Sequence, residues 1–251
     1  MEIAVRMARI GSSILSLIAL MMITVMTAYG GYSLWDSYMV NQGGFLSNDL
    51  LKYKPNGDPE AARLSLEELM AINEDVLGWL TIEDTHIDYP VVQGETDMEY
   101  INKDVMGDFA LAGSIFLSCL NTSDFTDRYN LVYGHHMDNG GMFGDVLEFV
   151  DSQYFESHQT GVLFLTDRSF DIQLFACIEA DGYDKLIYRV GPEYGTEELL
   201  DYLKASSTQY RDIGVTPEDQ IIAFSTCVDA ATNGRVVLYG RLEEKEIQKG
   251  Q

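Results

Sequence analysis

An uncharged stretch near the N-terminus constrains this chain more than any other feature of its sequence. From Ile10 to Trp35, 26 residues pass without a Lys, Arg, Asp or Glu. A helix needs roughly 20 mostly apolar residues to cross the hydrocarbon of a bilayer. We therefore predict one transmembrane helix, over residues 10–30.

The charges around this stretch predict its orientation. Arg6 and Arg9 precede it and Asp36 follows it, and positive residues next to a span favour the cytoplasmic side. The N-terminus is therefore expected inside and the remainder outside, as in a single-pass protein of the cell membrane. A cleaved secretory signal is the alternative, but its apolar region spans about 7 to 15 residues, and "TAYGGYS" is a poor cleavage site.

The remainder of the chain is strongly acidic. The sequence has 16 Lys+Arg and 40 Asp+Glu residues, a net charge of −24, and only Glu2, Arg6 and Arg9 among them precede the apolar stretch. Such a surface repels nucleic acid and anionic lipid headgroups, so no nucleic-acid partner is expected. The charge can attract amines or simply keep an exported protein soluble, and by itself it names no partner.

Short apolar runs from Val76 onward are typical of β-strands. Gly, Asn and Asp residues separate them, and only two helical patterns interrupt them. The eight runs are "GWLTI", "DYPVVQ", "GSIFLS", "NLVYGH", "GVLFLTD", "FDIQLFACIEA", "QIIAFST" and "RVVLYGRL". So many short strands with so few helices favour a mainly β fold, a barrel or a sandwich, over alternating strands and helices.

A tether with helical pieces is expected between the membrane span and the strands, over residues 31–75. In it, Ser65 and Glu68 form a capping box that predicts the start of a helix. Pro55 and Gly57 break the chain before that helix.

Two helical patterns interrupt the strands. The first covers residues 144–158 and the second residues 196–207. The second has Thr196 as its expected N-cap. Glu197 and Glu198 follow in the first turn, where the helix dipole favours negative charge.

The three cysteines differ in their surroundings. An odd number in an exported chain excludes a scaffold built on disulfides, so the fold must depend on its core. Cys119 and Cys177 lie inside apolar runs, where a free cysteine behaves as a small buried hydrophobe, and both are predicted to be structural. Cys227 ends its run beside a turn-rich segment, where a thiol can meet solvent and a base.

Four histidines are candidates for that base. His135 and His136 lie where a strand runs into a glycine-rich turn, so at least one imidazole projects from a strand end. His158 is expected to cap a helix C-terminus, and His86 to be an exposed strand residue. Metal binding by the adjacent pair is not predicted, because neighbouring side chains on a strand point to opposite faces and no CxxC or HExxH spacing accompanies them. No EF-hand spacing is present either, so neither a metal nor an organic cofactor is expected.

Cys227 and Arg235 flank a turn in the segment "STCVDAATNGR". A strand, a loop and a second strand would bring both residues to one pocket. The thiolate is the nucleophilic form of cysteine, and a nearby imidazolium or guanidinium stabilises it. We therefore predict that Cys227 attacks, a histidine exchanges the proton and Arg235 supports the oxyanion. For Arg235, a surface salt bridge with one of the many carboxylates is the alternative.

Four stretches, in order, resemble the motif series of the class B sortases. They are "HIDYPVVQG", "AGSIFLS", "LVYGHHMDNGGMFGD" and "AFSTC" with Arg235 eight residues on. The resemblance extends from about Val76 to Leu242. It implies an eight-stranded β-barrel with a few helices, preceded by N-terminal helices and a membrane anchor. Sortases are cysteine transpeptidases that cleave a surface protein at a sorting signal of the LPxTG or NPxTN kind and join the new carboxyl end to an amine of the cell wall.

The resemblance also implies which residues act. The catalytic residues would be Cys227, Arg235 and His135, the first of the two adjacent histidines, and Ser225 would help to hold the sorting peptide. The family usually has leucine before that serine, whereas this chain has Phe224, so its peptide groove is expected to differ. Residues 182–207 resemble the loop between strands six and seven that helps to choose the signal.

The resemblance further divides the chain into five parts. In order, they are a cytoplasmic N-terminus, a transmembrane anchor, a helical tether, a catalytic barrel outside the cell and a short tail, over residues 1–9, 10–30, 31–75, 76–245 and 246–251.

The predicted function is the covalent attachment of proteins that carry a sorting signal to a peptidoglycan precursor or cross-bridge amine. Polymerisation of pilin through a lysine side chain is the alternative within the family. Two other classes fit part of the pattern: a papain-like cell-wall hydrolase, in which the cysteine usually precedes the histidine, and a non-enzymatic anchored surface module with a buried Cys227.

Overall fold

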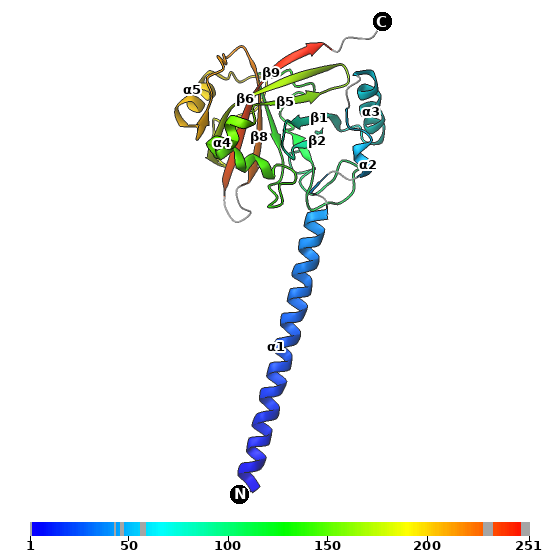
Figure 1. Ribbon diagram of the computed structural model, residues 1–251, viewed down its shortest axis with the longest axis vertical. Coiled ribbons are helices and arrows are strands. Elements are labelled where there is room, and N and C mark those ends of the chain that lie inside the picture. The colour runs from blue at the N-terminus through cyan, green and yellow to red at the C-terminus, as the bar shows by residue number, and fades with distance from the viewer. Residues whose placement is uncertain (1, 43, 46–47, 56–58, 228–232, 247–251) are drawn as a thin grey trace. The chain divides into compact units, whose positions relative to one another are not determined.

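The computed structural model of the chain describes residues 2–42, 44–45, 48–55, 59–227 and 233–246. The chain forms two compact units that meet in the sequence between Gln42 and Gly43. Figure 1 shows the first unit as one long helix and the second as a β-rich unit with short helices. Gly57, which was predicted to break the chain, and the tail from residue 247 lie outside the described residues.

The first unit is the helix α1, Glu2–Gln42. Within the described residues it is the one helix long and apolar enough, by length and composition, to cross a membrane, over Val5–Trp35. It continues past residue 30, where the tether was predicted to begin. Gly30 and Gly31 each weaken a helix by about 1 kcal/mol relative to alanine, but they keep the backbone N–H that a proline would remove.

Within the residues that the structure describes, nine strands build the sheet of the second unit. They are β1 (Val76–Ile82), β2 (Asp88–Val92), β3 (Ile115–Leu117), β4 (Tyr129–Tyr133), β5 (Thr160–Phe164), β6 (Arg168–Asp181), β7 (Gln209–Tyr210), β8 (Gln220–Cys227) and β9 (Gly234–Glu246). Eight of them close into a barrel in the order β5-β1-β2-β3-β4-β8-β9-β6, because β6 also pairs with β5. The two-residue β7 pairs with β6 alone. The predicted mainly β, eight-stranded barrel is confirmed, and each of the eight predicted runs is one of its strands.

The core explains why the central part of β8 is continuously apolar. In β8, Ile221, Ile222, Ala223 and Phe224 are all buried, on both faces of the sheet. A strand covered on both faces has a continuous rather than alternating apolar pattern.

The described part of the second unit also contains five helices: α2 (Asn48–Leu51), α3 (Pro59–Ile72), the 3-10 helix η1 (Gly144–Val150), α4 (Ser152–Ser157) and α5 (Glu197–Ser206). Leu199 and Leu203 of α5 belong to one buried cluster with Phe175 and Ile178 of β6 and Tyr239 of β9. Helix α5 is thereby fixed on the barrel wall.

The predicted start of α3 is wrong. The helix begins at Pro59, so the Ser65 of the expected capping box lies inside it. Proline is favoured in the first turn of a helix, and Arg63 forms ion pairs with Glu60 and Glu67 on the surface of that early part of the helix. These interactions extend the helix by six residues toward its N-terminus.

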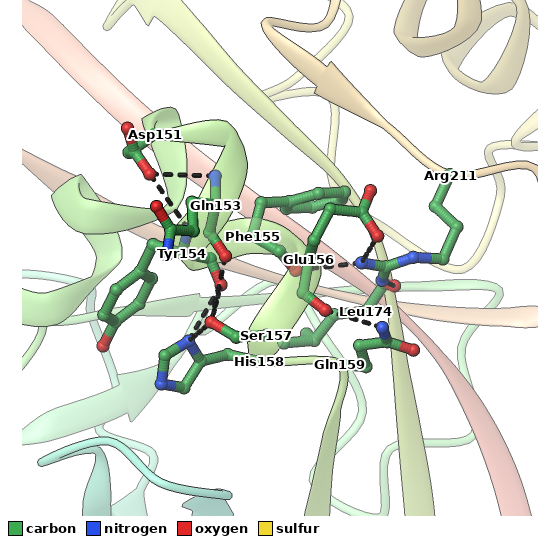
Figure 2. A network of polar contacts seen from close by, with 10 residues as sticks. All are labelled: Asp151, Gln153, Tyr154, Phe155, Glu156, Ser157, His158, Gln159, Leu174 and Arg211. Carbon is green, nitrogen blue, oxygen red and sulfur yellow. Dashed lines mark hydrogen bonds and ion pairs between the residues drawn. The ribbon is translucent and has the colours of Figure 1, made fainter.

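The predicted helix over residues 144–158 is split in two. Asp151 lies between the two helices and caps both. Its backbone N–H donates to Glu148 O at the C-terminus of η1. Its carboxylate accepts the N–H groups of Gln153 and Tyr154, at 2.9 and 3.0 Å, at the N-terminus of α4. His158 is the C-cap of α4, as predicted, and its Nδ1 donates to Tyr154 O at 2.8 Å. Figure 2 shows the bonds that Asp151 and His158 make at the two ends of α4.

Arg211 fastens α4 to the barrel. Its guanidinium donates to Leu174 O of β6 and to Phe155 O of α4, at 2.8 and 2.9 Å, and lies over the Phe155 ring (Figure 2).

The N-cap of α5 differs from the prediction in its chemistry. Thr196 holds the position, and Glu197 and Glu198 lie in the first turn as expected. The Thr196 side chain makes no hydrogen bond to the N-terminal N–H groups of α5. The reason is that a capping side chain needs an extended backbone, and the Thr196 backbone is helical (φ −101°, ψ −2°). Its Oγ1 instead donates to Pro217 O at 3.4 Å.

Asp88 joins the tether to the barrel and yields a prediction about stability. Its carboxylate accepts the Trp79 Nε1–H at 2.8 Å and the Thr81 hydroxyl at 3.0 Å, and it pairs with Lys54. Asp88→Ala would leave the buried Trp79 donor without that acceptor, which costs about 1–3 kcal/mol. Urea titration should report this decrease in the free energy of unfolding, whereas the exposed Asp201→Ala should change it little; equal effects would contradict the assignment.

Candidate active site

Three strand ends meet at one edge of the barrel. β4 and β8 run parallel, with Tyr133 level with Ser225, and both strands end at this edge. The Gly134 N–H continues the pairing to Ser225 O at 3.2 Å. β9 starts at the same edge, where Arg235 is the register partner of Cys227. His135 therefore follows β4 at the level where β8 ends in Cys227.

A pocket of about 270 Å³ lies at this edge. Its lining includes three of the predicted site residues, His135, Ser225 and Arg235. The other described lining residues are Asp97, Met98, Ile101, Phe116, Tyr133, Gly134, Gly182, Tyr188 and Thr226. Cys227 ends β8 next to this lining, but its side chain and residues 228–232 lie outside the described part of the chain.

The His135 ring is oriented by the backbone. Its Nε2 lies 2.8 Å from Ile101 O, and because a carbonyl oxygen only accepts, Nε2 carries the hydrogen of this bond. In the neutral imidazole the lone pair is then on Nδ1. His136 does not line the pocket; it forms a bridge with Met142, and its Nε2 pairs with Asp138 at 3.2 Å. Of the two adjacent histidines, His135 is thus the one that lines the pocket.

Arg235 lies against a glycine. Its Nη1 donates to Gly234 O at 2.9 Å, and a Cβ at Gly182 would be 3.4 Å from its Cζ. The guanidinium therefore lies within van der Waals distance of the position that a side chain at Gly182 would occupy.

Sequence reasoning missed Tyr188, whose hydroxyl is 3.0 Å from the Ser225 Oγ. Ser225 is only 2% exposed, so Tyr188 covers the hydroxyl that was assigned to peptide binding. Tyr129 supports this segment by donating its hydroxyl to Ile187 O at 2.8 Å. The segment 182–207 was identified from the sequence, but no pattern within it distinguished Tyr188.

Sequence reasoning also missed Asp97, Met98 and Ile101, which come from the connection between β2 and β3. The Asp97 carboxylate accepts the Cys119 N–H at 2.7 Å and the Ser118 hydroxyl at 3.3 Å, which fixes it at the pocket. This connection has neither strand nor helix periodicity, so the sequence offered no signal for it.

Cys119 and Cys177 differ more than predicted. Cys177 is fully buried in β6, and burial raises the pKa of its thiol to about 12. Cys119 is half-exposed, because β3 ends at Leu117 and the cysteine lies in the turn that follows. Partial burial, and then the nearby Asp97, also raise the pKa of the Cys119 thiol.

The prediction for His86 is wrong in part. The residue is exposed as expected, but it lies in the turn between β1 and β2 rather than in a strand. The Asp145 carboxylate holds it there, accepting its backbone N–H at 2.7 Å and lying 3.0 Å from its Nδ1. Among the described residues, no group of three or more His, Cys, Asp or Glu side chains is arranged to hold a metal ion.

Comparisons with known proteins extend over most of the chain. No protein-family model matches it. Sortase B of Listeria monocytogenes is 34% identical over 188 residues, which cover 73% of this chain and 76% of that protein. A class B sortase of Streptococcus pyogenes that is involved in pilus biogenesis has a solved structure with 42% identity and a TM-score of 0.64, covering 70% of this chain and 97% of that one. The Staphylococcus aureus sortase B–substrate complex matches with 29% identity and a TM-score of 0.67, over 72% and 85% of the two chains.

The raised thiol pKa values predict which cysteines react. A raised pKa lowers the thiolate fraction at neutral pH, and the thiolate is the reactive form. Cys119 and Cys177 should therefore label slowly with N-ethylmaleimide at pH 7 in the native chain, and Cys227→Ala should abolish rapid labelling. Mass spectrometry after labelling in denaturant, where all three cysteines react, is the control; rapid native labelling of Cys177 would contradict its burial.

Proposed function

The chain belongs to the class B sortases, which are cysteine transpeptidases, and on this premise we propose that Cys227, His135 and Arg235 transfer a sorting-signal peptide to an amine. The observation that carries the proposal is the meeting of three strand ends at one pocket that His135, Ser225 and Arg235 line. The papain-like hydrolase and the non-enzymatic module do not fit membership of this family.

The first half of the reaction forms a thioester. The Cys227 thiolate attacks the threonine carbonyl of a signal of the LPxTG or NPxTN kind, and the carbonyl oxygen becomes an oxyanion that Arg235 stabilises. The carbon–nitrogen bond then breaks, and the His135 imidazolium gives its proton to the departing amine.

The second half transfers the acyl group. Neutral His135 takes a proton from the incoming amine, which attacks the thioester carbon; the carbon–sulfur bond breaks and the Cys227 thiolate returns. Since Nε2 bonds to Ile101 O, we assign the proton exchange to Nδ1.

Ser225 and the segment 182–207 are proposed to bind the sorting peptide. Ser225 presents its Oγ at the pocket, where Tyr188 already contacts it at 3.0 Å. A bound peptide can therefore accept a hydrogen bond from this hydroxyl pair, donate one to it, or displace Tyr188. Phe224, at the position where the family usually has leucine, does not form part of the peptide-binding surface itself, because its side chain is fully buried.

The proposed acceptor is a peptidoglycan amine. Pilin polymerisation through a lysine is the second candidate, and its support is the 42% identity to the class B sortase involved in pilus biogenesis. In cells, the pilin role predicts ladders of covalent polymer, which a cell-wall role does not.

The proposed location is the cell membrane. α1 would cross the bilayer once, with Arg6 and Arg9 on the cytoplasmic side and the barrel outside. This arrangement would supply the barrel with exported proteins and cell-wall precursors as substrates.

The first test of the proposal follows the covalent intermediate. The full chain in detergent micelles is mixed with LPxTG-like or NPxTN-like peptides and read by intact-mass spectrometry. We expect an acyl adduct that Cys227→Ala abolishes and Cys119→Ala, the matched control, retains. Added diaminopimelate-type or lysine-containing peptides should convert the adduct to a joined product, and the preferred one identifies the acceptor. Adduct formation in Cys227→Ala would contradict the mechanism.

The second test concerns Arg235. Arg235→Lys keeps the charge but loses the planar fork of donors, and loss of an oxyanion donor costs roughly 100-fold in kcat. Steady-state transpeptidation should show this decrease, whereas Arg168→Lys, at an exposed ion pair of β6, should not. Near-normal turnover of Arg235→Lys would give Arg235 a structural role.

A further inference from the structure

Two distant parts of the chain hold the segment that carries His135. Tyr89 of β2 is 4% exposed, and its hydroxyl donates to Gly44 O at 2.8 Å and accepts the Met142 N–H at 2.9 Å. The Met142 N–H also lies 3.1 Å from Gly44 O. One group of hydrogen bonds thus joins three segments: Gly44 at the start of the second compact unit, Tyr89 of strand β2, and Met142 in the turn after the adjacent histidines. We call this group the joint.

This joint leads directly to the proposed base. Met142 forms a β-bridge with His136, and the next residue, Phe143, donates its N–H to His135 O at 2.9 Å. A displacement of Met142 would therefore move the backbone that is bonded to His135.

The joint is tightly packed and its backbone is constrained. A Cβ at Gly141 would lie 2.3 Å from Gly44 O, so only glycine permits this approach. Met142 has φ of 54°, in the left-handed region that residues other than glycine rarely adopt. Such a conformation persists where the surrounding structure imposes it, and here the bonds to Tyr89 and Gly44 do so.

We propose that Gly44, Tyr89 and Met142 form a latch that positions the His135 imidazole for proton transfer, so that Gly44, in the predicted tether ahead of helix α2, contributes to catalysis. Tyr89 is a positioning residue, because it acts through the backbone of the histidine segment. The tether is then more than a spacer between membrane and barrel. The inference rests on the proposed role of His135.

The latch is tested with two variants of the full chain in detergent micelles. Tyr89→Phe removes the hydroxyl and keeps the ring, and Gly141→Ala forces a methyl group against Gly44 O. The matched control for the first is Tyr100→Phe, whose buried hydroxyl donates to Asp75 at 2.7 Å and accepts from Asn73 at 2.9 Å. The control for the second is Gly31→Ala in α1, where a Cβ meets no atom within 4 Å.

Two readouts are compared. Misplacement of a catalytic group lowers the rate of the chemical step, so both latch variants should lower kcat for transpeptidation by roughly 10- to 100-fold, with KM for the peptide within about twofold. They should also shift the pH midpoint of Cys227 alkylation by iodoacetamide, which depends on the imidazole beside the thiol. Both controls should leave kcat and the midpoint unchanged, even where Tyr100→Phe lowers the melting temperature.

The outcomes separate the latch from the proposed function. The latch would be overturned if Tyr89→Phe had the same kcat and the same pH midpoint of alkylation as Tyr100→Phe. In that case an acyl adduct on the wild-type chain would still support the transpeptidase mechanism. A wild-type chain that forms no adduct counts against the proposed function. The alkylation assay needs no peptide. Even when the wild-type chain forms no adduct, the pH midpoint of Cys227 alkylation in Tyr89→Phe therefore still supports or overturns the latch.

Discussion

The parallel pairing of β4 with β8 is the constraint on which the site depends. Two parallel strands end at the same edge of a sheet, so the residues that follow β4 and the last residue of β8 become neighbours; an antiparallel pair would have put His135 and Cys227 at opposite ends of the barrel. The register is equally important, because a shift by one residue would exchange the two faces of a strand. The buried Asn130 helps to fix it, since its Nδ2 donates to Asp127 O at 2.9 Å and to Ile221 O of β8 at 3.3 Å.

Much of the barrel was predictable because several of its strands, such as β3, β4 and β8, are buried along nearly their whole length. Continuous apolar runs between Gly, Asn and Asp residues identify such strands without any knowledge of their partners. The closing pair of β5 with β6, and the parallel pair of β4 with β8, join segments whose pairing no local pattern encodes. The motif resemblance, rather than periodicity, implied that the eight strands close into a barrel; the order of the strands within it comes from the structure.

The site was predictable only where its residues lie at strand ends. His135, Ser225 and Arg235 follow from the motifs, whereas Asp97 and Tyr188 come from long connections whose conformation depends on tertiary contacts. The errors have the same origin. His86 leaves the strand because the distant Asp145 accepts its backbone N–H, and the hydroxyl of Thr196 bonds to Pro217 rather than to its own helix.

The glycine before His135 has a steric reason that links the core to the chemistry. A Cβ at Gly134 would lie 2.5 Å from the Ile115 side chain and 2.7 Å from the Phe143 ring, so only glycine allows the backbone to pass between them. Phe143 in turn bonds to His135 O, and Ile101 O receives the imidazole Nε2–H. The backbone of the histidine is therefore fixed by packing on one side, and the tautomer of its ring by a carbonyl on the other. In the part of the chain that the structure describes, a neutral carbonyl rather than a carboxylate thus orients the imidazole. This carbonyl selects the neutral tautomer whose lone pair is on Nδ1, the atom to which we assign the proposed proton exchange.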